Sequence, residues 1–133
     1  MGIPFGSDEW AKALMVAINN SDAYKAASKK WEGDLTFVVT KGGGMDQEKY
    51  IYLDLWHGEC RDAYSSDTAV DSAFVLTGDL QIWKDILSGK TDAIKSLMQR
   101  KLKLKGNMMK IMKVPKSATE LVACASSLDT EWP

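Results

Sequence analysis

The sequence predicts an α+β fold, in which a five-stranded mixed, mostly antiparallel sheet has helices packed on one face. The first observation is a set of segments where apolar residues alternate as in strands: residues 35–40, 50–56, 59–65, 74–77 and 101–105. The second is helical spacing of apolar residues before the first strand, between the fourth and fifth strands, and after the fifth. The gap between sheet and helices is a natural place for an apolar cavity.

Two helices are expected ahead of the sheet, and each follows a serine that can cap it. Ser7 precedes two acidic residues, and Trp10 and Leu14 lie along one face of the helix that follows. Ser21 opens the second helix, whose apolar side includes Tyr24. No residue of either helix indicates chemistry, so we interpret both as packing elements.

The next three strands read as an antiparallel meander. Phe37 lies on the apolar side of the first strand. In the second strand, Tyr50, Tyr52 and Trp56 lie opposite the aliphatic residues, and such two-sided apolar character is unusual for a strand with one wet face. Either the second face is half-covered, or it contacts another chain. The latter would make the protein a protein-interaction or dimerisation module, a homodimer for example.

A helical section follows the fourth strand. Asp79 is the expected cap of a helix whose apolar face includes Trp83 and Leu87, and residues 94–98 form a second apolar stripe. In the fifth strand, residues 101–105, leucines alternate with lysines.

Two further helices are predicted after the fifth strand: a methionine-rich helix that ends at residues 114–115, and a last helix near the end of the chain. Ser117 and Glu120 have the spacing of a capping box, which places the start of that helix at Ser117. Leu121 lies on its apolar face, and the tail from Asp129 is expected to fray.

Four methionines surround the fifth strand: Met98, Met108, Met109 and Met112. Unbranched thioethers adapt to variable shapes, which suits a loosely fitted apolar ligand. Methionines also simply fill cores, and residue type alone leaves both interpretations open.

The same region resembles the signature of the SCP2 sterol-carrier family. Residues 88–114, SGKTDAIKSLMQRKLKLKGNMMKIMKV, are similar to that family's glycine-lysine, its lysine-leucine-lysine strand and its Gly-Asn turn. Residues 52–58 and 73–77 resemble its earlier strands, so the likeness spans roughly residues 31–114. Arg100 stands where the family usually has a small residue and Met109 where it often has glycine; we expect both to alter the mouth or volume of a cavity.

The resemblance implies that residues 1–133 form a single SCP2-like lipid-binding domain. Its function would be non-catalytic binding, and transfer, of fatty acyl chains, sterols or similar apolar ligands, with the last helix as a cover of the cavity. The family's domain also occurs fused to enzymes, so an accessory domain of a lipid-handling enzyme is the alternative. The expected lipid-binding residues are Phe37, Phe74, Leu76, Trp83, Leu87, Met98, Leu104, Met108, Met109, Met112 and Leu121.

Composition favours an ordinary globular domain. The 133 residues are 45% hydrophobic and 26% charged, and no apolar run is long enough for a membrane span. The first residues lack the features of a signal peptide. Cys60 and Cys124 are expected to be buried, reduced thiols of a cytoplasmic protein, and their spacing indicates neither a disulfide framework nor a metal. We therefore expect no metal and no cofactor.

Charge is unevenly distributed along the chain. Residues 90–116 hold nine Lys or Arg and one acidic residue, a local charge of +8, whereas the net charge of the chain is −1. Such a segment suits transient contact with an anionic membrane surface. Lysines also protect sheet edges from aggregation, and this alternative stays open. Nucleic acid is not an expected partner, because no aromatic residues are interleaved for base stacking.

No pattern in the sequence predicts an enzyme. His57 is the single histidine and sits in a predicted hairpin turn, where side chains are usually solvated. The chain has neither the GxSxG pattern of a nucleophile elbow nor a Walker loop. We expect no catalytic residues.

Overall fold

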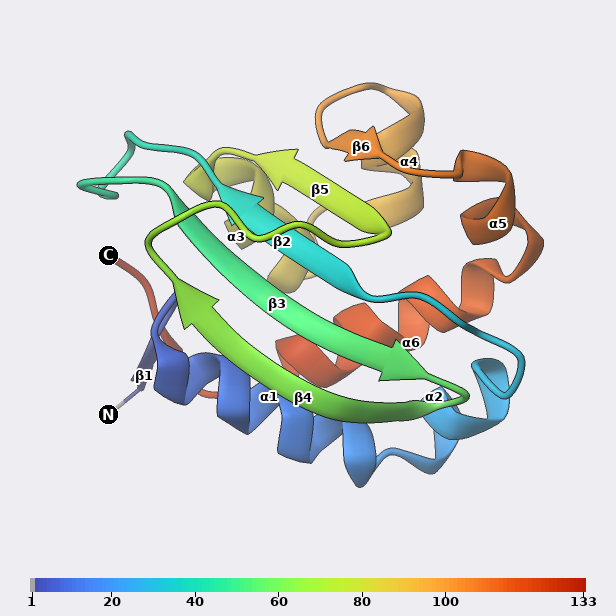
Figure 1. The fold of residues 1–133 in the computed structure, drawn as a ribbon. Coiled ribbons are helices and arrows are strands. Elements are labelled where there is room, and N and C mark those ends of the chain that lie inside the picture. Colours follow the sequence, from blue (N-terminus) through green and yellow to red (C-terminus); the bar gives the residue numbers. More distant parts are fainter. Residues whose placement is uncertain (1) are drawn as a thin grey trace.

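The computed structural model describes residues 2–133 and has a five-stranded sheet as its centre (Figure 1). The strand order is β4-β3-β2-β5-β6, in which β2 and β5 are parallel and all other neighbours are antiparallel. The predicted mixed, mostly antiparallel sheet is therefore confirmed. Its strands are β2 (Leu35–Val39), β3 (Lys49–Trp56), β4 (Glu59–Ser66), β5 (Phe74–Gly78) and β6 (Lys103–Lys105).

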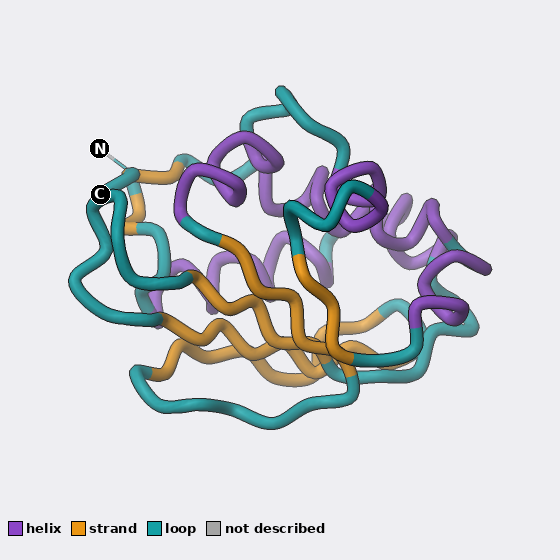
Figure 2. Tube along the Cα trace, turned by 90° about the horizontal axis from the view of Figure 1, so that it is seen from above, coloured by secondary structure: helices purple, strands orange, loops and turns teal. Residues whose placement is uncertain are grey.

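The helices gather on one side of this sheet, as Figure 2 shows. The caps predicted at Ser7, Ser21 and Asp79 are confirmed: their side-chain oxygens accept backbone N–H groups of the first turns at 3.1, 3.0 and 2.8 Å. These bonds satisfy donors that a helix leaves free at its start. The helices are α1 (Asp8–Asn19), α2 (Asp22–Ala27), α3 (Leu80–Leu87), α4 (Ala93–Met98), α5 (Met108–Lys113) and α6 (Pro115–Ser126).

The outer face of the sheet is half-covered by the chain itself. The ring of Tyr52 packs on Tyr64 with 5.0 Å between centroids, and its hydroxyl donates to a carboxylate oxygen of Asp34 at 2.8 Å. Ser72, in the connection from β4 to β5, bonds to the fully buried Thr36 across a 2.8 Å contact of hydroxyl oxygens. The unusual second face of β3 thus has partners within the chain.

The start of α6 differs from the prediction. The helix begins at Pro115 rather than at Ser117, and no side chain caps it. Proline suits the first helical position because its fixed φ is already helical and its missing N–H would have no partner there. Ser117 is consequently inside the first turn, where its hydroxyl is buried and free for another contact.

The expectation of a frayed tail is also wrong. Strand β7 (Thr130–Glu131) pairs in parallel with β1 (Ile3–Pro4), near the amino terminus. The indole N–H of Trp10 donates to the hydroxyl of Thr130 at 3.0 Å. Trp132 packs on Phe5 with 4.6 Å between ring centroids. The two ends of the described chain are therefore joined on the side of α1 (Figure 1).

Candidate functional site

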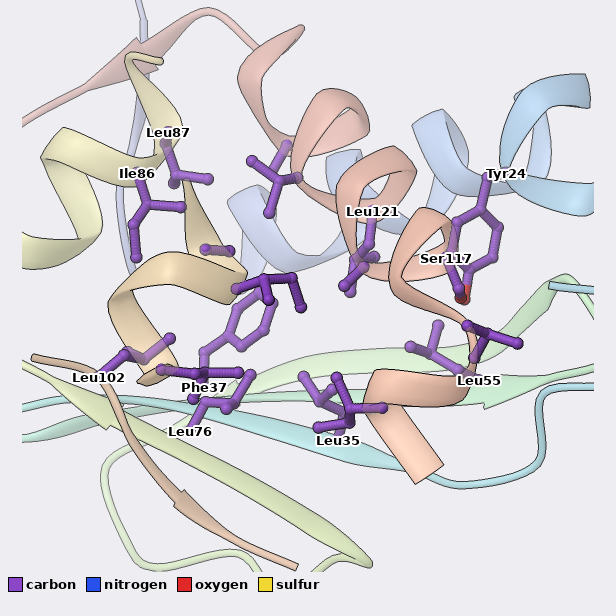
Figure 3. A pocket seen from close by; sticks show the side chains of 18 of the residues that line it. Tyr24, Leu35, Phe37, Leu55, Leu76, Ile86, Leu87, Leu102, Ser117 and Leu121 are labelled. Atoms are coloured by element: carbon purple, nitrogen blue, oxygen red, sulfur yellow. The ribbon is translucent and has the colours of Figure 1, made fainter. Parts of the chain in front are cut away.

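An apolar cavity lies between the inner face of the sheet and the helices, where the sequence led us to expect one (Figure 3). Side chains from β2, β3, β5 and all helices except α1 line it, together with Trp31, Leu102 and Val114 from connecting segments. The cavity has about 60 Å³ of free volume. Among the lining residues that the structure describes, none carries a charge.

The sheet side of the cavity follows from strand alternation. Leu35 and Phe37 are two residues apart on β2 and therefore point to the same face. The register places Phe37 beside Leu76 of β5, and Leu55 of β3 extends the same wall. The inner faces of three neighbouring strands thus form one continuous aliphatic and aromatic surface.

The helical side is anchored by Trp83 of α3. Its ring packs on Phe37 with 4.7 Å between centroids, and its indole N–H donates to the backbone oxygen of Val38 at 3.0 Å. This bond lets the large ring be buried without an unpaired donor. Leu87 on the same helix and Leu121 on α6 complete the apolar wall.

One end of the cavity is polar. Tyr24 of α2 and Ser117 of α6 line it there, and Figure 3 shows the two side chains meeting. The hydroxyl oxygens of Ser117 and Ser28 are 2.6 Å apart in the buried interior. Burial raises the pKa of Tyr24 to about 12, and the neighbouring hydroxyl groups of Ser28 and Ser117 offset only part of that rise. The phenol is therefore protonated and neutral at physiological pH.

A second, more open cleft of about 300 Å³ adjoins the cavity at the surface. It lies along α6 and the connection between α3 and α4. Four side chains line both spaces and thus separate them: Ile86, Ala93, Ile94 and Val122.

The predicted lipid-binding residues fall into three groups. Those that line the cavity are Phe37, Leu76, Trp83, Leu87 and Leu121. Three others are in or against the core without lining the cavity. Phe74 is buried and packs on Trp31 at 5.0 Å, and Leu104 and Met108 are half-buried against the core.

The remaining three, Met98, Met109 and Met112, are exposed, with 68%, 68% and 38% of their surfaces open to solvent. None of the three lines the cavity, because each sits on the outer side of a helix of only six residues, and their contact with lipid stays a prediction. Ile111 takes the inward position on α5. Arg100 is exposed as well, so neither departure from the family pattern changes the cavity wall.

Several lining residues were missed by the sequence analysis. Leu35 and Leu55 could have been found, because each shares a strand face with residues already recognised as inward. Tyr24 and Ser117 could not, because the spacing of Tyr24 fits a packing helix and that of Ser117 fits a helix cap.

The other predicted features are placed as follows. Burial raises the pKa of the Cys60 thiol to about 12 and also raises that of Cys124, so both are protonated at neutral pH. His57 is exposed, and its ring Nε2 lies 2.6 Å from a carboxylate oxygen of Glu32. Within residues 2–133, no three His, Cys, Asp or Glu side chains gather where they could hold a metal ion. No helix in this range is both long and apolar enough to cross a bilayer.

Comparison with known families decides the relationship. Residues 12–118 match the model of the SCP-2 sterol transfer family, which covers most of the chain. The chain belongs to this family. The resemblance inferred from residues 88–114 is therefore confirmed. A search of curated proteins found no match to this SCP-2 chain.

Solved structures support the same assignment. A crystal structure of sterol carrier protein 2 is 32% identical, covers 93% of this SCP-2 chain and 98% of its own, and superposes with a TM-score of 0.89. The solution structure of a conserved hypothetical protein from Thermus thermophilus, described as possibly a sterol carrier protein, is 30% identical over 98% of this chain and 95% of its own, with a TM-score of 0.90.

A more distant structure is sterol carrier protein 2 from Aedes aegypti in complex with palmitate. It is 22% identical over 93% of this chain and 98% of its own, with a TM-score of 0.55. At this identity the likeness shows the fold alone.

Proposed function

We propose that residues 1–133 act as a single, non-catalytic domain that binds apolar lipids in the cavity and transfers them. The observation that carries the proposal is the cavity itself, a space between sheet and helices lined by uncharged, almost wholly apolar side chains. Membership of the SCP-2 sterol transfer family supports it. The palmitate bound by the Aedes aegypti protein is a ligand of the expected kind.

The free volume of about 60 Å³ requires the cavity to expand around its ligand. A cavity of about 150 Å³ holds a molecule the size of benzene, and a long acyl chain is far larger. The four residues that line both spaces, Ile86, Ala93, Ile94 and Val122, separate the cavity from the surface cleft. We infer that the acyl chain of the lipid enters between these four residues as α4 and α6 separate, because this movement breaks no hydrogen bond of the sheet.

The energetics allow such a movement. Each buried methylene contributes about 0.8 kcal/mol, so a sixteen-carbon chain gains roughly 12 kcal/mol. Association costs at least about 4 kcal/mol, so the favourable free energy of binding is at most about 8 kcal/mol. That value corresponds to micromolar affinity. Any larger cost of opening would weaken binding further.

Exchange with an anionic membrane is the second part of the proposal. Met98 and Met109 are the most exposed large apolar side chains, and they lie on α4 and α5 at one end of the molecule (Figure 1). They are surrounded by the basic segment, residues 90–116. Lys110 is the exception among its lysines, because it donates to the backbone oxygen of Glu32 and lies over the Trp31 ring at 5.3 Å.

We propose that the protein is not an enzyme because the side chains that line the cavity offer little chemistry. Tyr24 and Ser117 supply the only hydroxyl groups among the lining side chains that the structure describes. The raised pKa of Tyr24, about 12, makes it unsuited to act as a base at neutral pH. Two alternatives stay predictions: that the protein is an accessory domain of a lipid-handling enzyme, and that it forms a homodimer.

A cavity-filling variant tests lipid binding. Ala125 of α6 is buried and lines the cavity, so Ala125→Leu adds three carbons to the free space. We expect displacement of the apolar dye Nile red by long-chain lipids to weaken by about tenfold or more, because the ligand must displace extra protein volume.

Ala26→Leu is the matched control, since Ala26 is exposed on α2 and away from the cavity. Thermal unfolding would verify that both variants are folded, and Leu121→Phe fills the same space if Ala125→Leu is unstable. Folded cavity variants that bind lipid as the wild type does would show that the ligand lies elsewhere.

A further inference from the structure

The outer edge of β4 is the longer of the two edges of the five-stranded sheet. Strand β4 has eight residues, whereas β6 at the opposite edge has three. An edge strand turns part of its backbone N–H and C=O groups away from its one neighbour, and these groups can pair with a strand of another chain. In β4, the register with β3 turns the groups of Cys60, Ala63 and Ser65 outward.

Helix α1 runs along this edge (Figure 1), and its last residue, Asn19, takes both outward groups of Cys60. The side-chain oxygen of Asn19 accepts the N–H of Cys60 at 2.8 Å, and the side-chain nitrogen donates to the C=O of Cys60 at 2.9 Å. A neighbouring strand would make the same two kinds of bond at such a residue.

The outward groups of Ala63 and Ser65 are also occupied. A carboxylate oxygen of Asp8 accepts the N–H of Ser65 at 3.1 Å, and the ammonium group of Lys12 donates to the C=O of Ala63. The N–H of Ala63 donates to the carboxylate of Asp62, the preceding residue, at 2.9 Å. Five of the six outward groups on these three β4 residues therefore bond to side chains.

The three side chains from α1 match the strand in length. Asp8, Lys12 and Asn19 are four and seven positions apart, so they lie along one face of the helix. Eleven helical residues span about 16 Å at 1.5 Å each. Five steps along a strand, from Ser65 to Cys60, also span about 16 Å. The polar face of α1 thus takes the place of a neighbouring strand along β4.

We propose that the outer edge of β4 is a pairing surface for a second copy of this chain, and that Asp8, Lys12 and Asn19 hold it closed. The edge is complementary to itself, because antiparallel copies of one strand related by a twofold axis bring N–H groups opposite C=O groups. The proposal is independent of lipid binding, because no residue of α1 is among the described residues that line the cavity.

The closing side chains can be removed without detaching α1. Leu14 and Ile18 are fully buried and anchor the helix in the core. The side chains of Asp8 and Lys12 are instead 62% and 51% exposed, so they lie where a second chain would approach. Their replacement should open the edge and leave the core packed.

Self-association of a triple variant tests the proposal. Asp8→Ala/Lys12→Ala/Asn19→Ala removes the three side chains and leaves the net charge unchanged. We expect light scattering of a concentration series to give the triple variant about twice the mass of the wild type, because two exposed β4 edges pair.

The matched control removes the same kinds of side chain at Glu9, Asn20 and Lys29. All three are exposed, and in the described part of the chain their side chains make no hydrogen bond with β4. Glu9→Ala/Asn20→Ala/Lys29→Ala should therefore keep the mass of the wild type.

A proline distinguishes strand pairing from aggregation of an unfolded chain. Because the N–H of Ser65 points away from β3, Ser65→Pro spares the β3–β4 bonds and blocks a partner strand. Added to the triple variant, it should return the mass to that of the wild type. Thermal unfolding verifies that each variant is folded, and Asn19→Ala alone is the substitute if the triple variant is unstable. A folded variant with the wild-type mass, equal association of the control, or association that survives the proline would each overturn the proposal.

Discussion

Arg100 holds a backbone conformation that glycine normally adopts. Its φ is +61°, in the left-handed region, directly after the last turn of α4. Its N–H donates to the carbonyl of Leu97 at 3.1 Å, and the next N–H, of Lys101, donates to that of Ser96 at 3.0 Å. This pair of bonds defines a Schellman motif, in which a side chain at the left-handed position is strained.

Replacement of Arg100 by glycine should therefore stabilise the protein. Relief of the left-handed strain should stabilise the folded protein by about 1–2 kcal/mol. The greater freedom of glycine in the unfolded chain opposes this and destabilises the folded protein by about 0.5–1 kcal/mol. We expect Arg100→Gly to raise the free energy of unfolding by roughly 0.5–1 kcal/mol in urea denaturation. Arg100→Ala removes the same charge and keeps the strain, so equal stability of the two variants would contradict this account.

Ser117 shows where local sequence patterns fail. The same type of signal correctly located the caps at Ser7 and Ser21, whose hydroxyl oxygens accept backbone N–H groups of the first turns. At Ser117 the preceding Pro115 already fits the helix start, and Ser28 offers a buried partner 89 positions away. A contact between residues so distant in sequence cannot be read from spacing.

At the scale of elements, α4 and α5 were predicted correctly, but the orientation of their methionines was not. A helix of six residues makes fewer than two turns, so its apolar spacing does not define a single buried face. The neighbouring sheet and α6 decide which side chain points inward, and on α5 this is Ile111. The strands β2, β3 and β5 were predictable because large apolar residues recur at every second position, even though the opposite face of β3 is largely aromatic.

The exposed methionines lead to a prediction about membranes. The double variant Met98→Ser/Met109→Ser should bind anionic phospholipid vesicles several-fold more weakly than the wild type, because it loses apolar surface within the basic segment. Vesicle cosedimentation at low salt measures the effect, and added salt should weaken binding of both proteins.

Val16→Ser provides the control for that experiment. Val16 is 58% exposed but lies on α1, outside the basic segment. Equal loss in the control and the double variant, or binding that does not depend on anionic lipid, would contradict contact through α4 and α5.

For the molecule as a whole, the paired termini hold the two ends of the chain together, whereas the wall between cavity and cleft is the part that we expect to move. The β1–β7 pair joins the two ends, and a bond from the Trp10 side chain of α1 to Thr130, 120 positions apart in sequence, adds to it. Two strands of two residues each have no recognisable alternation, which is why the sequence predicted a frayed tail there. The barrier between cavity and cleft involves α3, α4 and α6 instead, so it can open while the ends stay joined.

The central claim is that the narrow apolar cavity widens to hold a lipid. Native mass spectrometry of the purified protein, before and after incubation with 1-hexadecanol and palmitate, tests it most directly. We predict a population heavier than the 14.7 kDa chain by the mass of one lipid, and its loss in Ala125→Leu. A spectrum that shows only the bare chain under every condition would contradict the account.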